Sequence, residues 1–392
     1  MMNEKKPLIS PFVAFSLFFL LGYGAWGTVN SYWSVYFNSF DYSNLQIGIL
    51  SSIGPFAAFF GLLFWGARAD RSKSRSRIIV LLCLLQGCFS FLYLLYDNYF
   101  FIFALTCALM FCFYPLTPVG DAMFLEYCQL GKANYGRGRV FGSVGLATLP
   151  MLPGLAISHF GTKALFPAYA ALLFLILLIA LCLPKMTGGQ SGKGKKINLL
   201  AIRHDRQMVG LLSFLFLLHI TLGFYYSFFP VYMDNLGIGS LIGLNNLLQF
   251  APEIVFCFFV VTAAKRFGFA KLYAIAFALT ALRLLLIGSV SSPAALLATN
   301  FFGGVGYSMC MMLFSLFALR TPKALRTSAQ MLNTMVAHSF ARFIGSILGG
   351  KLADIFGLER VFTMAGIFGI FLFFALVIWL KKTGSLQDKV LM

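Results

Sequence analysis

Residues 164–183 read ALFPAYAALLFLILLIALCL, twenty consecutive residues without a charged side chain. An α-helix needs about 20 predominantly apolar residues to cross the hydrocarbon core of a bilayer. This stretch therefore predicts a transmembrane helix. Residues 185–206 follow it and contain four glycines and six Lys or Arg residues, a composition typical of a flexible linker.

Six apolar runs precede this linker and six follow it, which predicts an all-α integral membrane protein with twelve transmembrane helices. We expect an N-terminal six-helix bundle over residues 1–184, a cytoplasmic linker over 185–206 and a C-terminal six-helix bundle over 207–392. The apolar runs lie at residues 10–38, 44–66, 78–96, 99–127, 140–158, 164–183, 208–232, 240–263, 272–291, 294–319, 328–350 and 361–380.

The composition agrees with membrane spans and leaves the net charge to be explained. Hydrophobic residues make up 60% of the chain and charged residues 11%, whereas a soluble domain has about 25% charged residues. The net charge of +18 would indicate nucleic-acid binding in a soluble protein. In a membrane protein, Lys and Arg also accumulate in cytoplasmic loops.

The placement of the basic residues decides between these interpretations. With the N-terminus inside and an even number of spans, 24 of the 30 Lys and Arg residues fall in cytoplasmic segments. Three fall outside, Lys163, Lys351 and Arg360, and the other three, Arg139, Arg283 and Arg342, lie within spans. This asymmetry predicts a multi-pass protein of the plasma membrane, or cell inner membrane, with both termini in the cytoplasm. The lipid bilayer, and no nucleic acid, is the expected partner.

Ionisable side chains inside the spans are the first candidates for function, because each costs roughly 2.5 to 3.5 kcal/mol to insert. Asp121 and Arg139 lie nine residues on either side of the midpoint of their loop, so in an antiparallel hairpin they reach similar depths and can pair. Glu253 and Arg283 have the same relation at fifteen residues on either side.

Two roles are open for these charges. They can be structural ion pairs that lock neighbouring helices together, or they can line a polar cavity, where they bind substrate or carry protons. Glu126 is nearer the cytoplasmic end of its span, so we interpret it as a loop contact.

Further candidates for the lining of such a cavity are Asn30, Tyr225, Tyr226 and Arg342. The tyrosines offer hydrogen bonds and rings, and Arg342 offers a charge for an anionic substrate. Packing is the rival explanation for the aromatic residues, since the chain has 46 Phe and 16 Tyr. His219 and His338 are of the residue type that titrates near neutral pH, but each is more often a hydrogen-bonded packing histidine.

Motifs for ATP or metal chemistry are absent from the sequence. The glycine-rich pieces are not followed by Gly-Lys-Ser/Thr, and no His-Glu-x-x-His or Cys-x-x-Cys occurs. We therefore expect neither a cofactor nor a metal site, and neither an ATP-driven pump nor a zinc protease. An integral-membrane enzyme remains a remote alternative, because the charges form no evident catalytic cluster.

The loop between the second and third spans carries a recognisable motif. Gly66-Ala-Arg-Ala-Asp70-Arg71, followed by Arg75, resembles the signature loop of the major facilitator superfamily, with Lys73 where a glycine is usual. The resemblance implies the major facilitator fold, with two pseudo-symmetric bundles, and a cytoplasmic gate formed by Gly66, Asp70, Arg71 and Arg75. A merely basic inner loop would explain the arginines but not Asp70.

Residues 135–145, YGRGRVFGSVG, are similar to the start of helix five in the branch that contains lactose permease and phenylpropionate permease. That resemblance implies that Asp121 and Arg139 bind substrate and that Glu253 and Arg283 match an acidic residue and an arginine of the family. The chain departs from lactose permease at the sugar-stacking tryptophan and at three coupling positions of helix ten, where it has Leu146, Asn300, Gly303 and Gly306. Glu253, Arg283 and Asp121 are therefore the expected proton-coupling residues.

These observations predict a secondary transporter, monomeric, that moves a small-molecule substrate with a proton by alternating access. A phenylpropionate-like aromatic acid is the first expected substrate, because three arginines and an aromatic lining suit a carboxylate and a ring. The alternatives are a sugar or nucleoside:proton symporter, or a drug or solute exporter.

Overall fold

The computed structural model describes residues 9–131, 133–184, 186, 205–257, 259–290, 292–318 and 332–383. Most of the predicted linker, residues 187–204, lies outside the described residues, as do residues 319–331 and both chain ends. Within the described residues the chain is helical and contains no strand. The all-α membrane fold expected from the sequence is confirmed.

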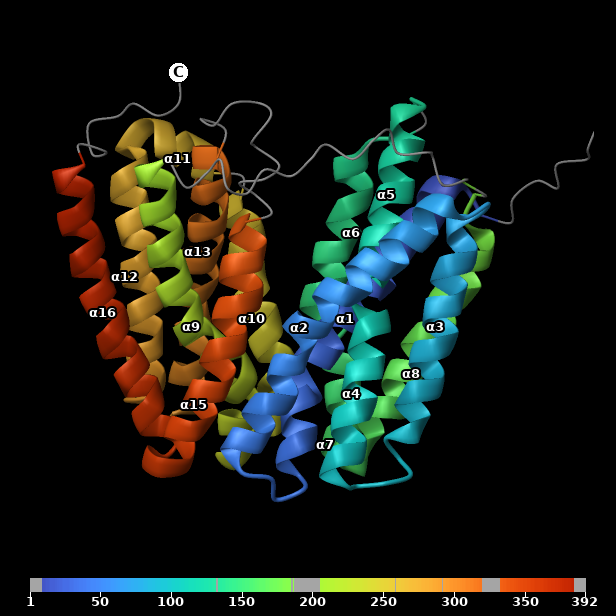
Figure 1. Ribbon diagram of the computed structural model, residues 1–392, viewed down its shortest axis with the longest axis horizontal. Helices are drawn as coiled ribbons and strands as arrows, with labels where there is room; N and C mark the ends of the chain where they lie inside the picture. The colour runs from blue at the N-terminus through green and yellow to red at the C-terminus, as the bar shows by residue number, and fades with distance from the viewer. Residues whose placement is uncertain are drawn as a thin grey trace, which may run out of the picture. The chain divides into compact units, whose positions relative to one another are not determined.

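The helices of the N-terminal half follow one another along the chain as long apolar segments with short turns (Figure 1). They are α1 (Pro11–Asn38), α2 (Asn44–Arg71), α3 (Arg75–Leu92), α4 (Tyr99–Phe113), α5 (Leu116–Gln129), α6 (Tyr135–Thr148), α7 (Met151–Phe160), the 3₁₀ turn η1 (Thr162–Ala164) and α8 (Leu165–Cys182).

The C-terminal half repeats this pattern, with a π-helical segment before its fifth long helix. Its elements are α9 (Arg206–Asn235), the 3₁₀ turn η3 (Gly239–Leu241), α10 (Ile242–Cys257), α11 (Val260–Phe267), α12 (Phe269–Ile287), α13 (Pro293–Ala318), η4 (Thr334–Ala341), α15 (Arg342–Phe356) and α16 (Leu358–Lys382).

Ten segments of the described chain are long and apolar enough to cross a membrane. Two of them join shorter helices: α4 with α5, and α6 with α7. Pro115 and Pro150 lie at these two junctions, where a proline cannot donate the helical hydrogen bond. The other two expected spans coincide with α10 and α11, on either side of residue 258, and with η4 and α15.

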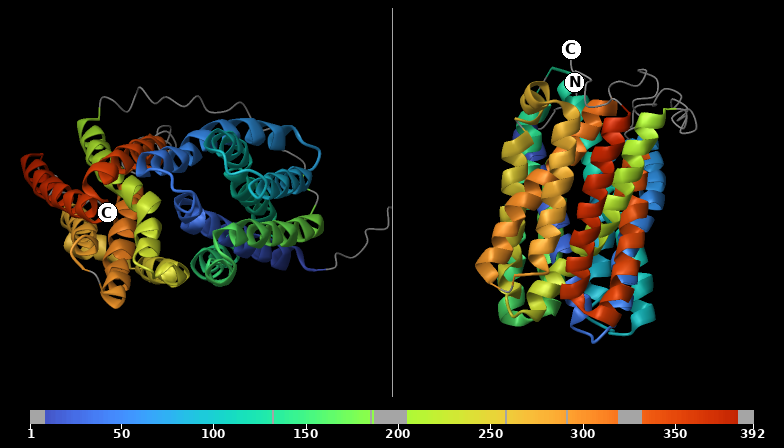
Figure 2. Two further views of the ribbon diagram at one scale, coloured as in Figure 1. Left: turned by 90° about the horizontal axis from the view of Figure 1, so that it is seen from below. Right: turned by 90° about the vertical axis from the view of Figure 1, so that its left-hand side faces the viewer.

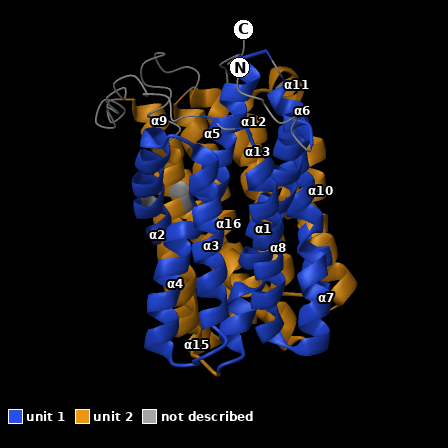
Figure 3. Ribbon diagram, turned by 90° about the vertical axis from the view of Figure 1, so that its right-hand side faces the viewer, with its two compact units in different colours: residues 1–40, 56–194, 239–246 blue, residues 41–55, 195–238, 247–392 orange. Residues whose placement is uncertain are grey.

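The chain forms two compact units (Figure 3). Unit 1 contains residues 1–40, 56–194 and 239–246, and unit 2 contains residues 41–55, 195–238 and 247–392. Two short segments thus belong to the unit of the opposite half. The start of α2 is part of unit 2, and the start of α10 is part of unit 1.

The same close contact occurs once in each unit. In unit 1, a methyl group on Gly145 of α6 would collide with the main-chain oxygen of Leu20 on α1. In unit 2, a methyl group on Gly345 of α15 would collide with the main-chain oxygen of Ile220 on α9. Small residues allow helix backbones to approach this closely. The first and fifth spans of each half therefore pack through an equivalent glycine.

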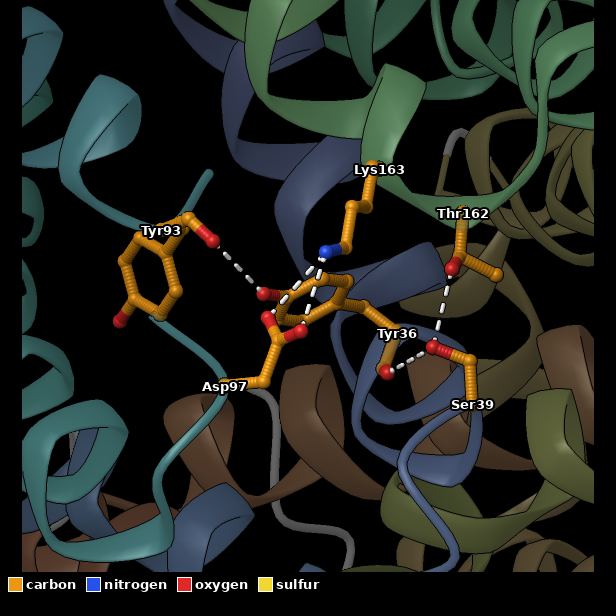
Figure 4. Close-up of polar contacts among 6 residues, drawn as sticks. All are labelled: Tyr36, Ser39, Tyr93, Asp97, Thr162 and Lys163. Atoms are coloured by element: carbon orange, nitrogen blue, oxygen red, sulfur yellow. Dashed lines mark hydrogen bonds and ion pairs between the residues drawn. The ribbon is translucent and has the colours of Figure 1, made fainter. Parts of the chain in front are cut away.

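One end of unit 1 is tied together by polar contacts between loops (Figure 4). Lys163, in the turn between α7 and α8, forms an ion pair of 3.1 Å with Asp97, after α3. Thr162 donates to Ser39, after α1, at 2.9 Å, and the hydroxyl of Tyr36 donates to the main-chain oxygen of Tyr93 at 3.1 Å. These contacts fix the ends of three helices on one side of the unit.

Candidate functional site

The predicted pairing of Asp121 with Arg139 is confirmed in unit 1. Arg139 Nε on α6 lies 3.4 Å from Asp121 Oδ1 on α5. The Asp121 side chain is 21% exposed and the Arg139 side chain 30% exposed, so neither is sealed in the core. Each side chain therefore keeps part of its surface exposed.

Two tyrosines complete this cluster. Tyr23 of α1 donates to Asp121 Oδ2 at 2.9 Å, and Tyr135, at the start of α6, donates to Oδ1 at 3.1 Å. The guanidinium carbon of Arg139 lies 3.9 Å from the centroid of the Tyr23 ring, within cation–π range. The sequence analysis missed both tyrosines as site residues, although Tyr135 opens the stretch that resembles helix five.

Gly142 provides the space for this arrangement. A methyl group on Gly142 would lie 2.6 Å from Nη1 of Arg139 and 2.8 Å from Cδ2 of Tyr23. The glycine one turn after Arg139 therefore lets the guanidinium fold back over the tyrosine. This gives a local reason for the Arg-x-x-Gly spacing at residues 139–142.

The predicted cytoplasmic gate is centred on Arg75. Its side chain is only 8% exposed and forms ion pairs with Glu126 on α5, at 2.8 Å, and with Asp70 at the end of α2, at 3.4 Å. Glu126 thus contacts the first residue of α3, next to the loop that follows α2. Gly66 has open space around it and Arg71 is exposed, so within the described residues neither contributes to this network.

Arg283, in unit 2, is buried and held by neutral oxygens. Nη2 donates to the hydroxyl of Tyr225, to Gln249 Oε1 at 3.3 Å and to Asn300 Oδ1 at 2.5 Å. The guanidinium carbon lies 4.0 Å from the centre of the Tyr225 ring. A methyl group on Gly303 would overlap the guanidinium. Asn300 and Gly303 thus form part of the pocket of Arg283.

The ion pair that the spacing of Glu253 and Arg283 allowed is not formed: both residues are described, and no ion pair within 4 Å joins them. Equal distance from a turn sets depth but not rotation. Gln249, one turn before Glu253 on α10, faces Arg283 instead. Glu253 Oε2 is buried, and no hydrogen-bond partner for it occurs in the described part of the chain.

Arg342, at the start of α15, forms a second arginine–tyrosine group. Its guanidinium carbon lies 4.3 Å from the centre of the Tyr226 ring, and Nη2 donates to the Tyr307 hydroxyl at 3.3 Å. Gln249 connects the two groups, because its Nε2 donates to Tyr226 at 3.2 Å while its Oε1 accepts from Tyr225 at 3.1 Å. Gln249 is a site residue that the sequence analysis missed, since it carries no charge.

Two other candidates make contacts within their own helices. Asn30 donates to the main-chain oxygen of Trp26 at 2.8 Å, and its side chain is exposed. His219 is buried, and its Nδ1 lies 2.9 Å from the main-chain oxygen of Leu215. The contact of His219 is what the packing interpretation of this residue expects.

Comparisons with known proteins agree on the kind of protein. A model of the MFS_1 like family matches residues 12–364. The uncharacterized transporter YwbF of Bacillus subtilis is 24% identical over 385 residues, covering 95% of this chain and 94% of the relative. Maltose permease of Geobacillus stearothermophilus is 24% identical, with 87% of each chain covered.

A third relative and one solved structure complete the comparison. The putative nucleoside transporter YegT of Escherichia coli is 22% identical, covering 85% of this chain and 81% of the relative. The crystal structure of the nucleoside transporter NupG superposes with a TM-score of 0.84 at 17% identity, covering 94% of this chain and 99% of that one. At this identity the structural likeness establishes the fold.

Proposed function

Because the chain belongs to the MFS_1 like family, whose matched relatives are membrane transporters, we propose that it is a proton-coupled symporter of a neutral, hydroxyl-rich solute of nucleoside or glycoside type. The chain is a multi-pass secondary transporter.

The observation that carries the substrate class is the accessible Asp121–Arg139 pair. The pair has no net charge, yet it presents carboxylate acceptors beside guanidinium donors. Such a pair suits hydroxyl groups, which both donate and accept, and it leaves no net charge for an ionic substrate to balance. The names of two relatives, maltose permease and a putative nucleoside transporter, refer to solutes of this kind.

Support for proton coupling comes from Glu253. One of its carboxyl oxygens is buried without a hydrogen-bond partner in the described part of the chain. A buried, unpaired carboxylate is costly, whereas a protonated carboxyl is tolerated. Glu253 is therefore suited to bind a proton in one state of the transport cycle and to release it in another. Arg283 is held by neutral oxygens and would act as a positioning residue for Tyr225 and Gln249.

A second candidate substrate, the aromatic acid expected from the sequence, is favoured by one observation. Arg342 lies against the Tyr226 ring and bonds to Tyr307, and no carboxylate of the described residues lies within 4 Å of it. A cation beside two aromatic rings suits an aromatic carboxylate. The two candidates differ in charge and so can be separated directly.

Uptake into proteoliposomes with an inward proton gradient tests the proposal, using labelled uridine, maltose and phenylpropionate as probes. We expect accumulation of uridine or maltose that disappears when the gradient is removed. Accumulation of phenylpropionate alone would favour the second candidate. Chemical turnover of a probe without movement into the lumen would contradict transport altogether.

Two variants separate binding from coupling. Glu253→Gln should abolish accumulation driven by the gradient but retain exchange of labelled for unlabelled substrate. Asp121→Asn should impair both. Glu359→Gln, in the exposed first turn of α16, is the control and should behave as the parent protein. Full coupled uptake by both site variants would exclude the proposed roles.

A further inference from the structure

The surface of unit 2 contains a groove that transport does not explain. The groove lies along α12 and α16, which pack side by side (Figures 1 and 2). Its volume is about 470 Å³, and its lining is apolar except for Lys271 and Lys381. None of the candidate transport residues lines it.

The hollow has a simple origin in the sequence. Ala270, Ala274 and Ala278 follow one another at four-residue spacing, so they lie on one face of α12. Their small side chains leave a furrow, which Phe373 and Val377 of α16 border on the other side. The furrow therefore results from side-chain size along a continuous helix.

The length of the groove matches one leaflet of a bilayer. Its lining on α12 extends from Ala270 to Leu282, twelve residues or about 18 Å at 1.5 Å per residue. Half of the hydrocarbon core of a bilayer is about 15 Å thick. An acyl chain of one leaflet can thus lie along the whole groove.

The two lysines mark one end of the groove. Lys271 is the third residue of α12 and Lys381 the last but one of α16, and both are exposed. The predicted orientation puts this end at the cytoplasmic surface, where anionic lipids attract basic side chains. Two cations at the interfacial end of an apolar groove complement an anionic headgroup above an acyl chain.

We infer that this groove is a binding site for an anionic phospholipid, with one acyl chain between α12 and α16 and the phosphate at Lys271 and Lys381. The inference does not depend on the transported substrate, because no residue of the proposed transport site takes part. Two features distinguish this lipid from bulk lipid: the charges of Lys271 and Lys381 at one end of the groove, and the shape of the apolar furrow along the rest.

Native mass spectrometry of the full-length protein in detergent, titrated with phosphatidylglycerol or phosphatidylcholine, tests the site. We expect tighter binding of phosphatidylglycerol. The Lys271→Gln/Lys381→Gln double variant should bind it about 10- to 30-fold more weakly, since each surface lysine contributes about a factor of five. The matched control is Lys265→Gln/Lys382→Gln, which removes two exposed charges that do not line the groove and should change binding less than twofold.

A second variant tests the acyl-chain part without changing charge. Ala278→Phe fills the furrow and should weaken phosphatidylglycerol binding by at least about tenfold while the protein remains monomeric. Equal weakening by the control pair, or unchanged binding in both groove variants, would overturn the inference. The inference would also be overturned if the protein formed a dimer that is lost in Ala278→Phe and persists when lipid is added. A second copy of the chain would then occupy the groove.

Discussion

Asp354, at the end of α15, accepts a hydrogen bond of 2.7 Å from the main-chain N–H of Asn44, at the start of α2 and 310 residues away in the sequence. Its second oxygen accepts from the N–H of Leu45 at 3.0 Å. A carboxylate in this position satisfies free N–H groups of the first turn and interacts favourably with the helix dipole. Asp354 therefore acts as the N-terminal cap of a helix distant in sequence and fixes the start of α2 in unit 2.

We predict that Asp354→Ala lowers the free energy of unfolding by about 1 kcal/mol, the usual cost of losing a helix cap. Asp354→Asn keeps one acceptor oxygen and should lose less. Thermal unfolding of the purified protein measures both. Lys351→Gln, an exposed change on the same helix, is the control, and an equal effect in the control would exclude a capping role.

The buried Arg75 gives a second prediction. Because Glu126 and Asp70 are 39% and 48% exposed, water screens their charges when Arg75 is lost. A double-mutant cycle of Arg75→Gln with Glu126→Gln should give a coupling energy of about 0.5 to 1 kcal/mol that decreases with salt. Arg77→Gln, an exposed arginine on the same helix, should show no coupling to Glu126. A coupling near zero for Arg75 would mean that the network does not hold α3 to α5.

Gly303 is the glycine of the candidate site at which an added methyl group has the least room. Gly303→Ala places a methyl group where the Arg283 guanidinium lies, and overpacking of this kind costs about 1–3 kcal/mol. We expect a thermal midpoint lower by several degrees and uptake at least about tenfold lower. Gly87→Ala on α3, whose added methyl group meets nothing within 4 Å, should leave stability unchanged or raise it by up to about 1 kcal/mol. Normal uptake by Gly303→Ala would mean that Arg283 can move without consequence.

Tyr23 tests the polar cluster of unit 1. Tyr23→Phe keeps the ring beneath Arg139 and removes only the hydroxyl that donates to Asp121. Hydrogen bonds to charged groups contribute about 1.5 to 3 kcal/mol, so we expect KM for uptake to rise about tenfold or more. Tyr169→Phe removes a buried hydroxyl that donates to Gln86 elsewhere in unit 1. It should lower stability without changing KM, and a KM change of equal size there would contradict a specific role for Tyr23.

Local properties of the sequence were enough to predict the spans. The charge-free residues 164–183 contain α8 (Leu165–Cys182), as the sequence predicted. Transfer into a membrane depends mainly on the residues of one segment, so its free energy can be read without knowing the neighbours. The membership of residues 41–55 and 239–246 in the unit of the other half has no comparable signal in the sequence.

The two charge pairs show that sequence spacing does not predict which side chains meet. Each pair lies symmetrically about its turn, Asp121 and Arg139 at nine residues and Glu253 and Arg283 at fifteen. Only Asp121 and Arg139 form an ion pair. The uncharged Gln249 takes the position beside Arg283 that the spacing assigned to Glu253. The sequence by itself determined where the apolar membrane segments lie along the chain, because hydrophobicity acts within each segment. Which side chains meet was decided only by tertiary structure, because it depends on the rotation of each helix about its axis and on glycines such as Gly142 and Gly303 that make room for a guanidinium.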